Sequence, residues 1–312
     1  MRREVLQELL RLAEEEERLV LLTADLGYTV LEPFAERFPA RFFNVGVAEQ
    51  NMIGLATGLA ESGMIPFCYS MSTFATLRPF EVIRNGPLYH QLPVRILGVG
   101  GGFEYGSAGW THFGLEDVAL MRVLPEMTVV VPADSCQARQ ALRATWNLPG
   151  PVYYRLGKNE EQTVPGLNGR FRLQQIETVR TGEDALVLAM GPPAISALNA
   201  AESLEKEGVH AAVGIVSCLS PAPTEALMQD LALYPLVFTV EAHFVSGGLG
   251  SLVAETIAEH SLTCCLQRIG VSFIPRGRTG SEAHMNHVAG LSEEAIARRI
   301  LSACRPGGSA NG

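Results

Sequence analysis

Short apolar runs alternate with helix-compatible stretches along most of this chain, and this alternation limits the possible folds more than any other feature. The runs at residues 19–23 and 95–99 are each followed by turn residues, and the run at 128–131 leads into a helical stretch at 138–146. Strands that alternate with helices are typical of parallel sheets with helices on both faces. The sequence therefore predicts an α/β fold.

A polar, turn-rich bridge at residues 157–169 separates two blocks of this alternation. The first block closes with the apolar run 152–156, and the second repeats the pattern at 185–190, 211–216 and 236–241. A chain of 312 residues is long enough for two domains with separate cores. We expect domains at residues 1–170 and 171–312, each with a mostly parallel sheet, and a disordered tail at 305–312.

The charge of the chain argues against a nucleic-acid partner. The sequence carries a net charge of −9 and only two lysines, Lys158 and Lys206, so it lacks the basic surface that such partners need. No apolar run reaches the ~20 residues of a membrane-spanning helix. Apolar Val5, Leu9 and Leu12 at helical spacing instead predict an amphipathic surface helix near the N-terminus, not a signal peptide.

The six cysteines show no C-x-x-C spacing, so the sequence predicts neither a zinc knuckle nor a redox pair. Reduced, unpaired thiols are typical of proteins of the cytoplasm, where we expect this chain. His284 and His287 stand at i and i+3, which alone is more often a structural feature than a metal site. We therefore expect no metal ligand from this chain.

One carboxylate stands out where a strand gives way to a helix. In residues 44–57, NVGVAEQNMIGLAT, the apolar run from Phe42 to Val47 is followed by small residues that suit a helix, with Glu49 at the turn. The pattern predicts a buried strand and then a helix whose first acid lies near low-dielectric surroundings, where the proton affinity of a carboxylate can be tuned. Taken alone, the segment favours a simpler explanation, an acid that stabilises a helix N-terminus.

Further motifs follow Glu49 in a fixed order. Ser72-Thr73-Phe74 ends a second apolar strand, and after it come W-T-H at residues 110–112, L-E-D at 115–117, P-A-D at 132–134 and VEAHFVSGGLGSLVAE at 240–255. In this order and spacing the motifs resemble the transketolase family of thiamine diphosphate enzymes, namely its pyrimidine-binding domain followed by its C-terminal domain. The resemblance covers nearly the whole chain, and the ordered set is far more specific than any single motif.

The resemblance implies that this chain binds the aminopyrimidine ring of thiamine diphosphate. In the family a glutamate stabilises the imino tautomer by contacting the pyrimidine N1′ atom, and Glu49 matches it. Phe74 matches a phenylalanine that stacks on the ring, and Leu77 and Phe80 match apolar walls of the pocket. Asp25 matches an aspartate near the thiazolium ring. A lone phenylalanine after a strand would more often be an ordinary core residue.

The resemblance also implies three substrate contacts. His112 matches a histidine that faces the reacting carbons and hydrogen-bonds substrate hydroxyls, so Glu49 and His112 are the expected catalytic residues. Arg155 matches an arginine that binds the phosphate of a sugar phosphate, and Arg2 is a second candidate for that role. A surface ion pair is the simpler explanation of Arg155.

Two positions depart from the family pattern. Typical transketolases carry a histidine where this chain has Gly100 and an aspartate where it has Ala108, and both of those side chains touch the sugar. Trp110 also stands where a smaller residue is common. These differences imply an unusual or modified sugar substrate.

A motif that the family needs is missing from this sequence. The diphosphate and its Mg²⁺ (or Ca²⁺) are held in the family by a separate domain with G-D-G and a downstream asparagine, which supply oxygen ligands to the metal. No G-D-G occurs here. The resemblance therefore implies the C-terminal half of a split transketolase. Its expected partner is a chain that carries G-D-G, and the expected assembly is an α2β2 heterotetramer.

Three other functions stay open on the sequence. The β subunit of a 2-oxoacid dehydrogenase or decarboxylase shares the architecture and length, but the AEQN, STF, TH and LED set favours a ketol transferase. A deoxyxylulose-phosphate-synthase-like reaction is less compatible with a split chain. A non-catalytic scaffolding homologue would not need Glu49, Phe74 and His112, all of which are present.

Overall fold

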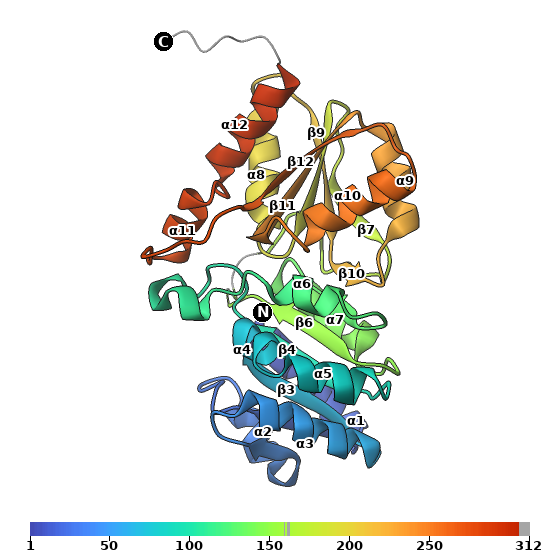
Figure 1. Cartoon of the computed structure of the whole chain (residues 1–312), viewed down its shortest axis with the longest axis vertical. Helices are drawn as coiled ribbons and strands as arrows, with labels where there is room; N and C mark the ends of the chain where they lie inside the picture. Colours follow the sequence, from blue (N-terminus) through green and yellow to red (C-terminus); the bar gives the residue numbers. More distant parts are fainter. Residues whose placement is uncertain (159, 161–162, 306–312) are drawn as a thin grey trace.

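Two sheets organise the computed structural model, which describes residues 1–158, 160 and 163–305 (Figure 1). The first has the strand order β10-β5-β6-β4-β3-β1-β2, and every pair is parallel except β10 with β5. Its strands are β1 (Leu19–Thr23), β2 (Phe42–Asn44), β3 (Ile65–Met71), β4 (Arg95–Val99), β5 (Thr128–Val130), β6 (Val152–Leu156) and β10 (Cys218–Ser220).

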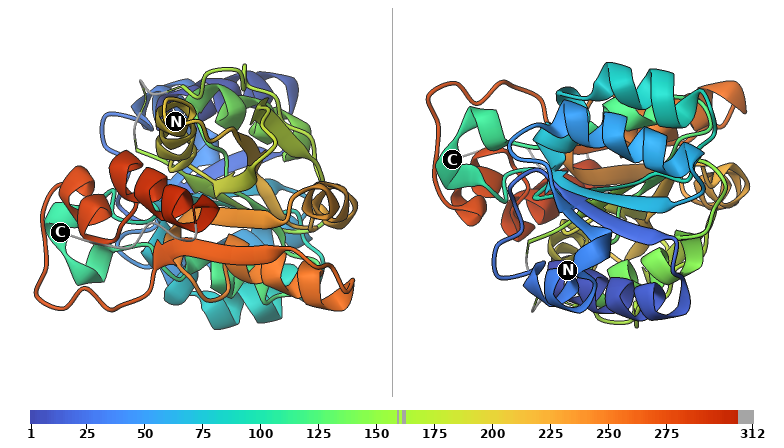
Figure 2. Two further views of the ribbon diagram at one scale, coloured as in Figure 1. Left: turned by 90° about the horizontal axis from the view of Figure 1, so that it is seen from above. Right: turned by 90° about the horizontal axis from the view of Figure 1, so that it is seen from below.

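Helices cover both faces of this sheet (Figure 2). One face carries α1 (Arg2–Glu15) and α7 (Ser135–Thr145), and α1 buries Val5, Leu9 and Leu12 as its sequence pattern predicts. The other face carries α3 (Glu49–Glu61), α4 (Ser72–Leu77), α5 (Phe80–Ile83) and α6 (Asp117–Arg122). The connections hold α2 (Glu32–Arg37) and four short turns, η1 (Pro39–Arg41), η2 (Arg84–Leu88), η3 (Gly106–Ala108) and η4 (Trp110–His112).

The second sheet has the order β12-β11-β8-β9-β7, with only β7 antiparallel to its neighbour. Its strands are β7 (Ile176–Arg180), β8 (Ala185–Met190), β9 (Ala211–Val216), β11 (Leu236–Phe244) and β12 (Cys265–Val271). The helices α8 (Ala194–Glu205) and α12 (Glu293–Cys304) pack on one face, and α9 (Thr224–Leu233) and α10 (Leu249–Glu259) pack on the other. A short α11 (Glu282–Val288) precedes α12. The predicted α/β fold with two mostly parallel sheets is confirmed.

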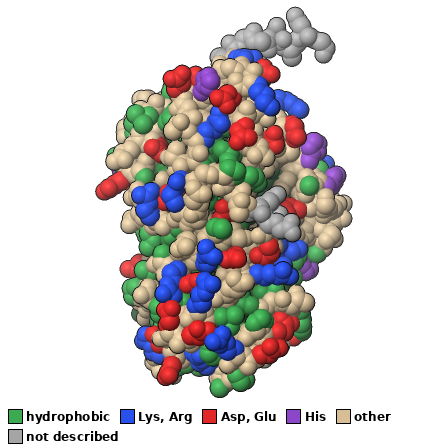
Figure 3. Space-filling model, turned by 180° about the vertical axis from the view of Figure 1, so that it is seen from behind, with side chains coloured by type: hydrophobic (Ala, Val, Ile, Leu, Met, Phe, Trp, Pro, Cys, Tyr) green, Lys and Arg blue, Asp and Glu red, His purple; other side chains and the backbone are tan. Residues whose placement is uncertain are grey.

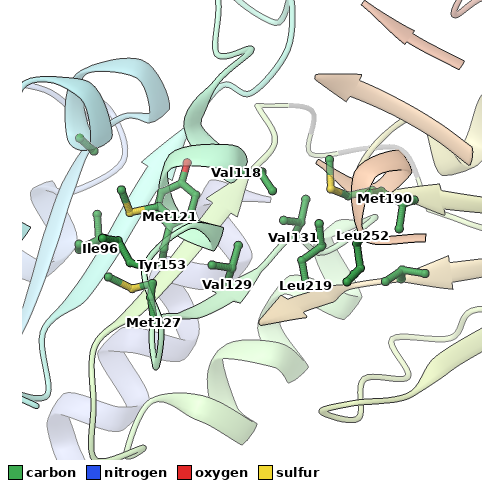
Figure 4. Close-up of a cluster of buried hydrophobic side chains, with 14 of the residues drawn as sticks. Ile96, Val118, Met121, Met127, Val129, Val131, Tyr153, Met190, Leu219 and Leu252 are labelled. Carbon is green, nitrogen blue, oxygen red and sulfur yellow. The ribbon is translucent and has the colours of Figure 1, made fainter. Parts of the chain in front are cut away.

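The two halves share one hydrophobic core (Figure 4). Strand β10 comes from the second half but pairs with β5 at the edge of the first sheet. Leu219 of this strand lies in the same cluster as Val131 from the first half and as Met190 and Leu252 from the second. Apolar side chains from both halves therefore leave water together, which stabilises their arrangement.

The segment before Glu49 differs from its prediction as a buried strand. Strand β2 covers only Phe42–Asn44 and lies at the edge of the sheet, where Phe43 is 37% exposed. Val47, beyond the strand, is 73% exposed. An edge strand has a neighbouring strand on one side only. Its side chains therefore have fewer neighbours to cover them than those of a central strand. The prediction of burial was wrong because it used composition without strand order.

Acidic and basic side chains are interspersed over the face in Figure 3 rather than separated into two regions. All six cysteines are unpaired. Within the described part of the chain, no helix is both long and apolar enough to cross a membrane. Apart from Arg305, the tail expected to be disordered lies outside the described residues.

Parallel strands place their carboxyl ends at one edge of each sheet, where ligands bind in folds of this kind. In the first sheet this edge receives the turn after β1 at Asp25, the start of α4 after β3, and the long loop after β4 that contains His112. The start of α3 at Glu49 lies there as well, since α3 follows β2. The fold thus gathers the predicted site residues at one edge.

Replacing Leu219 by alanine tests whether the shared core makes the two halves one unit of stability. Leu219 is only 1% exposed, so the new cavity should lower the free energy of unfolding by about 2–5 kcal/mol. Both tryptophans, Trp110 and Trp146, lie in the first half, so their fluorescence follows that half during urea unfolding. We expect the fluorescence midpoint to fall.

The matched control is Leu233→Ala, at a leucine that is 74% exposed, which should change the stability by less than about 0.5 kcal/mol. If Leu219→Ala left the tryptophan midpoint unchanged while the circular dichroism midpoint fell, the two halves would unfold independently.

Candidate active site

Glu49 is the first residue of α3, the end at which the helix dipole favours a carboxylate. Its side chain is almost fully buried, and each oxygen accepts a hydrogen bond. Ser70 Oγ donates to Oε1 at 3.1 Å, and Arg78 Nη1 donates to Oε2 at 2.6 Å. The guanidinium group offsets the cost of burying the negative charge. The carboxylate is therefore held in one position at the sheet edge.

Phe74 and His112 lie beside this ion pair. The guanidinium carbon of Arg78 lies 3.9 Å from the centre of the Phe74 ring, in a cation–π contact. The imidazole of His112 meets the same ring edge-on, with 5.2 Å between the ring centres. The structure therefore brings Glu49, Phe74 and His112 together. Arg78, which had no predicted role, contacts the first two.

His112 is positioned by the loop between β4 and α6. Gly102 and Gly114 exchange two backbone hydrogen bonds of 2.7 and 3.0 Å across the base of this loop. His112 ends the short turn η4, and its Nδ1 atom lies 2.9 Å from Thr111 Oγ1. The other ring nitrogen is left for a ligand or for water.

Asp25 lies in the turn after β1 with a left-handed backbone, φ 58°. Its Oδ1 atom accepts hydrogen bonds from Asn44 Nδ2 at 3.0 Å and from the Tyr28 hydroxyl at 2.9 Å. These bonds stabilise the ionised carboxylate and hold the pKa of Asp25 below its usual range. The side chain is a fixed negative charge at the same sheet edge as Glu49.

The two predicted apolar walls differ in their surroundings. Leu77, at the end of α4, is 43% exposed. Phe80, at the start of α5, is partly buried and packs against the core under α3. Leu77 thus leaves an apolar surface exposed at this edge of the sheet, whereas Phe80 packs against the core beneath the edge.

A cavity of about 200 Å³ lies next to this cluster, with Arg2, Tyr69, Ser70 and Tyr105 among its lining residues. Burial raises the pKa of Tyr69 to about 12 and also raises that of Tyr105, so both phenols keep their protons and can donate. The ammonium group of Lys158 lies 4.1 Å from the centre of the Tyr105 ring. This cavity combines hydroxyl donors with positive charge.

Gly100 makes room for Tyr105. A Cβ atom at Gly100 would collide with the ring of Tyr105, and the backbone there is left-handed, with φ 80°. A larger side chain therefore cannot stand at this position while Tyr105 keeps its place. Ala108, the other position where the sequence departs from the family pattern, is exposed in η3.

Arg155 lies in a different environment from the one expected of a phosphate ligand. It is only 4% exposed, and its Nε atom lies 3.1 Å from Asp117 Oδ2. Its Nη2 group donates to the carbonyl of Gly114 and, at 2.8 Å, to that of Ala242. Because Asp117 neutralises its charge and its Nη2 group binds two carbonyls of the protein, the structure favours a structural role for Arg155. Arg2 is the better candidate for an anion, because its ion pair with Glu160 is longer, at 3.7 Å, and 26% of its side chain is exposed.

Sequence reasoning missed Arg78, Ser70 and Tyr105. A signal for Arg78 existed, since it follows Phe74 by four residues, the spacing that places two side chains on one face of a helix. A buried glutamate also requires a cation nearby. Ser70 and Tyr105 carry no such local signal, because their positions depend on strand pairing and on the loop.

The cluster can bind a flat group that bears nitrogen. Glu49 accepts from an N–H or a protonated nitrogen, and Phe74 offers a ring face. The planar guanidinium of Arg78 makes both contacts at once, so a group of that shape fits between the two side chains. Among the described residues, no group of three or more His, Cys, Asp or Glu side chains is arranged to hold a metal, and His284 and His287 are no exception.

Comparison with known families gives two matches that together span most of the chain. The family described as transketolase, pyrimidine binding domain, matches residues 1–162. The family described as transketolase, C-terminal domain, matches residues 174–296. The two matches follow the division into two sheets, except that β10 lies within the second match and pairs into the first sheet.

Two curated relatives and one solved structure are similar over almost their full lengths. A transketolase C-terminal section of Methanocaldococcus jannaschii is 38% identical over 304 residues, covering 96% of this chain and 95% of the relative. The 6-deoxy-6-sulfo-D-fructose transketolase subunit of a Clostridium species is 36% identical, covering 93% and 90%. A structure described as a split gene transketolase, inactive beta4 tetramer, has a TM-score of 0.86 and 36% identity and covers 96% of both chains.

Relatives of this similarity, matched almost end to end, show more than a shared fold. The chain belongs to the transketolase family, among the C-terminal subunits of its split members.

Proposed function

We propose that this chain forms, with a partner chain, a transketolase that cuts a ketose between C2 and C3 and passes a two-carbon ketol unit to an aldehyde. The observation that carries the proposal is the cluster of Glu49, Phe74 and His112 at one sheet edge, with a planar cation between the first two. Membership of the family implies dependence on thiamine diphosphate, which supplies, when bound, a nucleophilic carbon for this cleavage.

The residues of the cluster fit the aminopyrimidine ring of that cofactor. We propose that Glu49 holds the proton at the pyrimidine N1′ atom, with Ser70 orienting the carboxylate, and that Phe74 stacks on the ring. Arg78 now makes both of these contacts, so its side chain has to move aside when the ring binds. Leu77 and Phe80 are proposed as apolar walls, and Asp25 as a charge near the thiazolium ring.

His112 is proposed to act on the substrate. Its imidazole is fixed at the edge of the Phe74 ring by the loop after β4. From there one ring nitrogen can donate to a sugar hydroxyl and move a proton to or from the reacting carbons' oxygen atoms. An imidazole held in this position can also orient the sugar.

Exposed apolar side chains around the cluster support a partner chain. Tyr28 is 68% exposed next to Asp25, Val47 is 73% exposed before Glu49, and Leu77 is 43% exposed after Phe74. Large apolar side chains grouped around a polar site are typical of surfaces that another chain covers. We propose that this partner holds the diphosphate through Mg²⁺ or Ca²⁺, in an α2β2 heterotetramer, and that the assembly is cytoplasmic.

The substrate is proposed to be a modified ketose with an anionic end. Arg2 and Tyr105 line the cavity beside the cluster and can bind a phosphate or a sulfonate, with the Lys158 ammonium group over the Tyr105 ring. The similar Clostridium subunit belongs to a transketolase of 6-deoxy-6-sulfo-D-fructose, which carries a sulfonate. We keep residues 1–170 and 171–312 as the proposed domains, with β10 reaching back across that boundary.

We predict that the isolated chain is inactive and binds thiamine diphosphate weakly or not at all. It carries the pyrimidine contacts but no G-D-G for the diphosphate and metal, so most of the binding energy is missing. Isothermal titration calorimetry of the pure chain with cofactor and Mg²⁺ checks this, with the reconstituted complex as the positive control. Micromolar binding by the chain alone would contradict the split-site proposal.

Glu49→Gln should abolish turnover in the reconstituted complex and leave the fold intact. A neutral amide cannot stabilise the protonated pyrimidine nitrogen, and acid–base contributions run to about 10²–10⁴-fold. Steady-state kinetics measure the loss, and circular dichroism checks the fold. The matched control is Glu61→Gln at the other end of α3, where the side chain is exposed. Retention of a third or more of the activity by Glu49→Gln would refute the assignment.

Arg2 and Arg155 should respond differently to substitution. We expect Arg2→Ala to raise KM for ketoses with an anionic end much more than for neutral ketoses, with Arg3→Ala, at an exposed neighbour, as the control. Arg155→Met should instead lower the free energy of unfolding by about 3–5 kcal/mol, because Asp117 is left buried without a cation.

A panel of ketoses in steady-state kinetics and urea unfolding of each variant separate these effects. A stable Arg155→Met enzyme with a selective rise in KM for anionic ketoses would restore Arg155 as the phosphate ligand.

A further inference from the structure

A second and larger cavity, of about 330 Å³, lies between the two sheets and away from Glu49. The first half contributes Glu104, Arg155 and Gly157 to its wall, and the second half contributes residues from the starts of α8, α11 and α12. It shares no lining residue with the cavity at Arg2. Ketol transfer as proposed above does not use this cavity.

The topology of the second sheet marks this place for ligands. From β8 the chain crosses through α8 to β9, whereas from β11 it crosses through α10 to β12 on the other side (Figure 1). Adjacent strands whose connections diverge in this way leave a crevice at their carboxyl ends, where open α/β sheets bind ligands. The cavity lies at that point, since Pro192 follows β8 and Ala242 belongs to the end of β11.

Two hydrogen-bond acceptors in the cavity wall have no partner among the described residues. Glu104 is 9% exposed, and its Oε2 atom accepts from the backbone of Lys158 at 3.0 Å, but its Oε1 atom is buried and unpaired. The Oδ1 atom of Asn286 is also buried and unpaired. Buried polar atoms are nearly always hydrogen-bonded. The Nε atom of Arg155, also in the wall, has no hydrogen-bond partner either, but it lies 3.1 Å from Asp117 Oδ2 in an ion pair. A ligand that donates hydrogen bonds would satisfy the two acceptors.

The charge of the wall favours a cation. Glu104, Glu282, Glu293 and Glu294 line the cavity, whereas the Arg155 charge is neutralised by Asp117. Burial, and after it the nearby Glu282 carboxylate, raises the pKa of Glu104 to about 8, against the weaker opposing effects of Arg155 and Lys158. Burial also raises the pKa of Glu282. A bound cation would stabilise the ionised form of both groups.

Two alternative ligands fit less well. A phosphate at this crevice would find no backbone N–H groups on Pro192 and Pro193 in the turn after β8, and the glutamates in the wall would repel its charge. A metal ion would need several oxygen or nitrogen ligands converging on one point, and the described residues contain no such group of three. An organic cation remains, with Ile195 and Leu291 available for its hydrocarbon part.

We propose that this cavity binds a small protonated aliphatic amine, with the ammonium group donating to Glu104 and Asn286 and the hydrocarbon chain against Ile195 and Leu291. The ligand would sit between the two halves of the chain, in contact with both. Its binding does not depend on the ketol-transfer reaction. An experiment can therefore contradict the amine site without contradicting the proposed function.

The test is calorimetry of the full chain with 1-aminobutane, and with 1-butanol as a neutral molecule of the same shape. We expect saturable binding of the amine, a rise in Tm with its concentration, and little or no binding of the alcohol. Glu104→Gln should weaken amine binding at least about tenfold, as for the loss of a charged hydrogen bond. The control Glu225→Gln, at an exposed glutamate of α9, should bind as the wild type does.

A second variant keeps the proposal testable if Glu104→Gln fails to fold. Ser196→Leu fills the cavity from α8 without removing a carboxylate, and it should also abolish amine binding. Equal binding of amine and alcohol, or unchanged amine affinity in Glu104→Gln or Ser196→Leu, would overturn the proposal. So would saturable binding of inorganic phosphate or Mg²⁺ at this cavity with none of the amine.

Discussion

The buried ion pair between Arg155 and Asp117 is the contact on which the arrangement of this molecule depends. Arg155 belongs to β6 and Asp117 to α6, and the Tyr153 hydroxyl donates to the same carboxylate at 2.6 Å. Arg155 also donates to Gly114 in the loop that carries His112 and to Ala242 of the second sheet. One guanidinium group thus connects the first sheet, the active-site loop and the second half. A buried charge tolerates only a narrow geometry, so this contact defines their relative positions.

The candidate active site also contains a buried charge that is stabilised by an opposite charge. Glu49 is acceptable at 2% exposure because Arg78 and Ser70 satisfy it. Unlike Arg155, Arg78 is itself largely exposed, with 45% of its side chain accessible. A guanidinium group that is half exposed to water can move away from its carboxylate at modest cost in free energy. A fully buried guanidinium group cannot. The structure therefore separates a fixed charge pair that shapes the molecule from an exchangeable one that keeps a binding site ready.

Some elements of the fold and of the site could be predicted from the sequence, and others could not. The apolar runs at 19–23, 95–99 and 185–190 became β1, β4 and β8 because buried parallel strands have continuous apolar sequences. Glu49, Phe74 and His112 were found from the order of their motifs, and the structure brings them together. Strand β10 has three residues, too few to show a period. The surroundings of Arg155 depend on Ala242, 87 residues away, and no local pattern carries that information.

The antiparallel pairing of β10 with β5 also bears on how such chains can be divided. Without β10, the outer edge of β5 would present unpaired N–H and C=O groups to water, and apolar Val129 and Val130 with them. Exposed strand edges of this kind recruit other chains and aggregate. A cut at the polar bridge near residue 165, between the two proposed domains, would therefore separate β10 from β5. A fragment that kept only the first half would lose the strand that covers the edge of β5, and it would be prone to pair with other chains there.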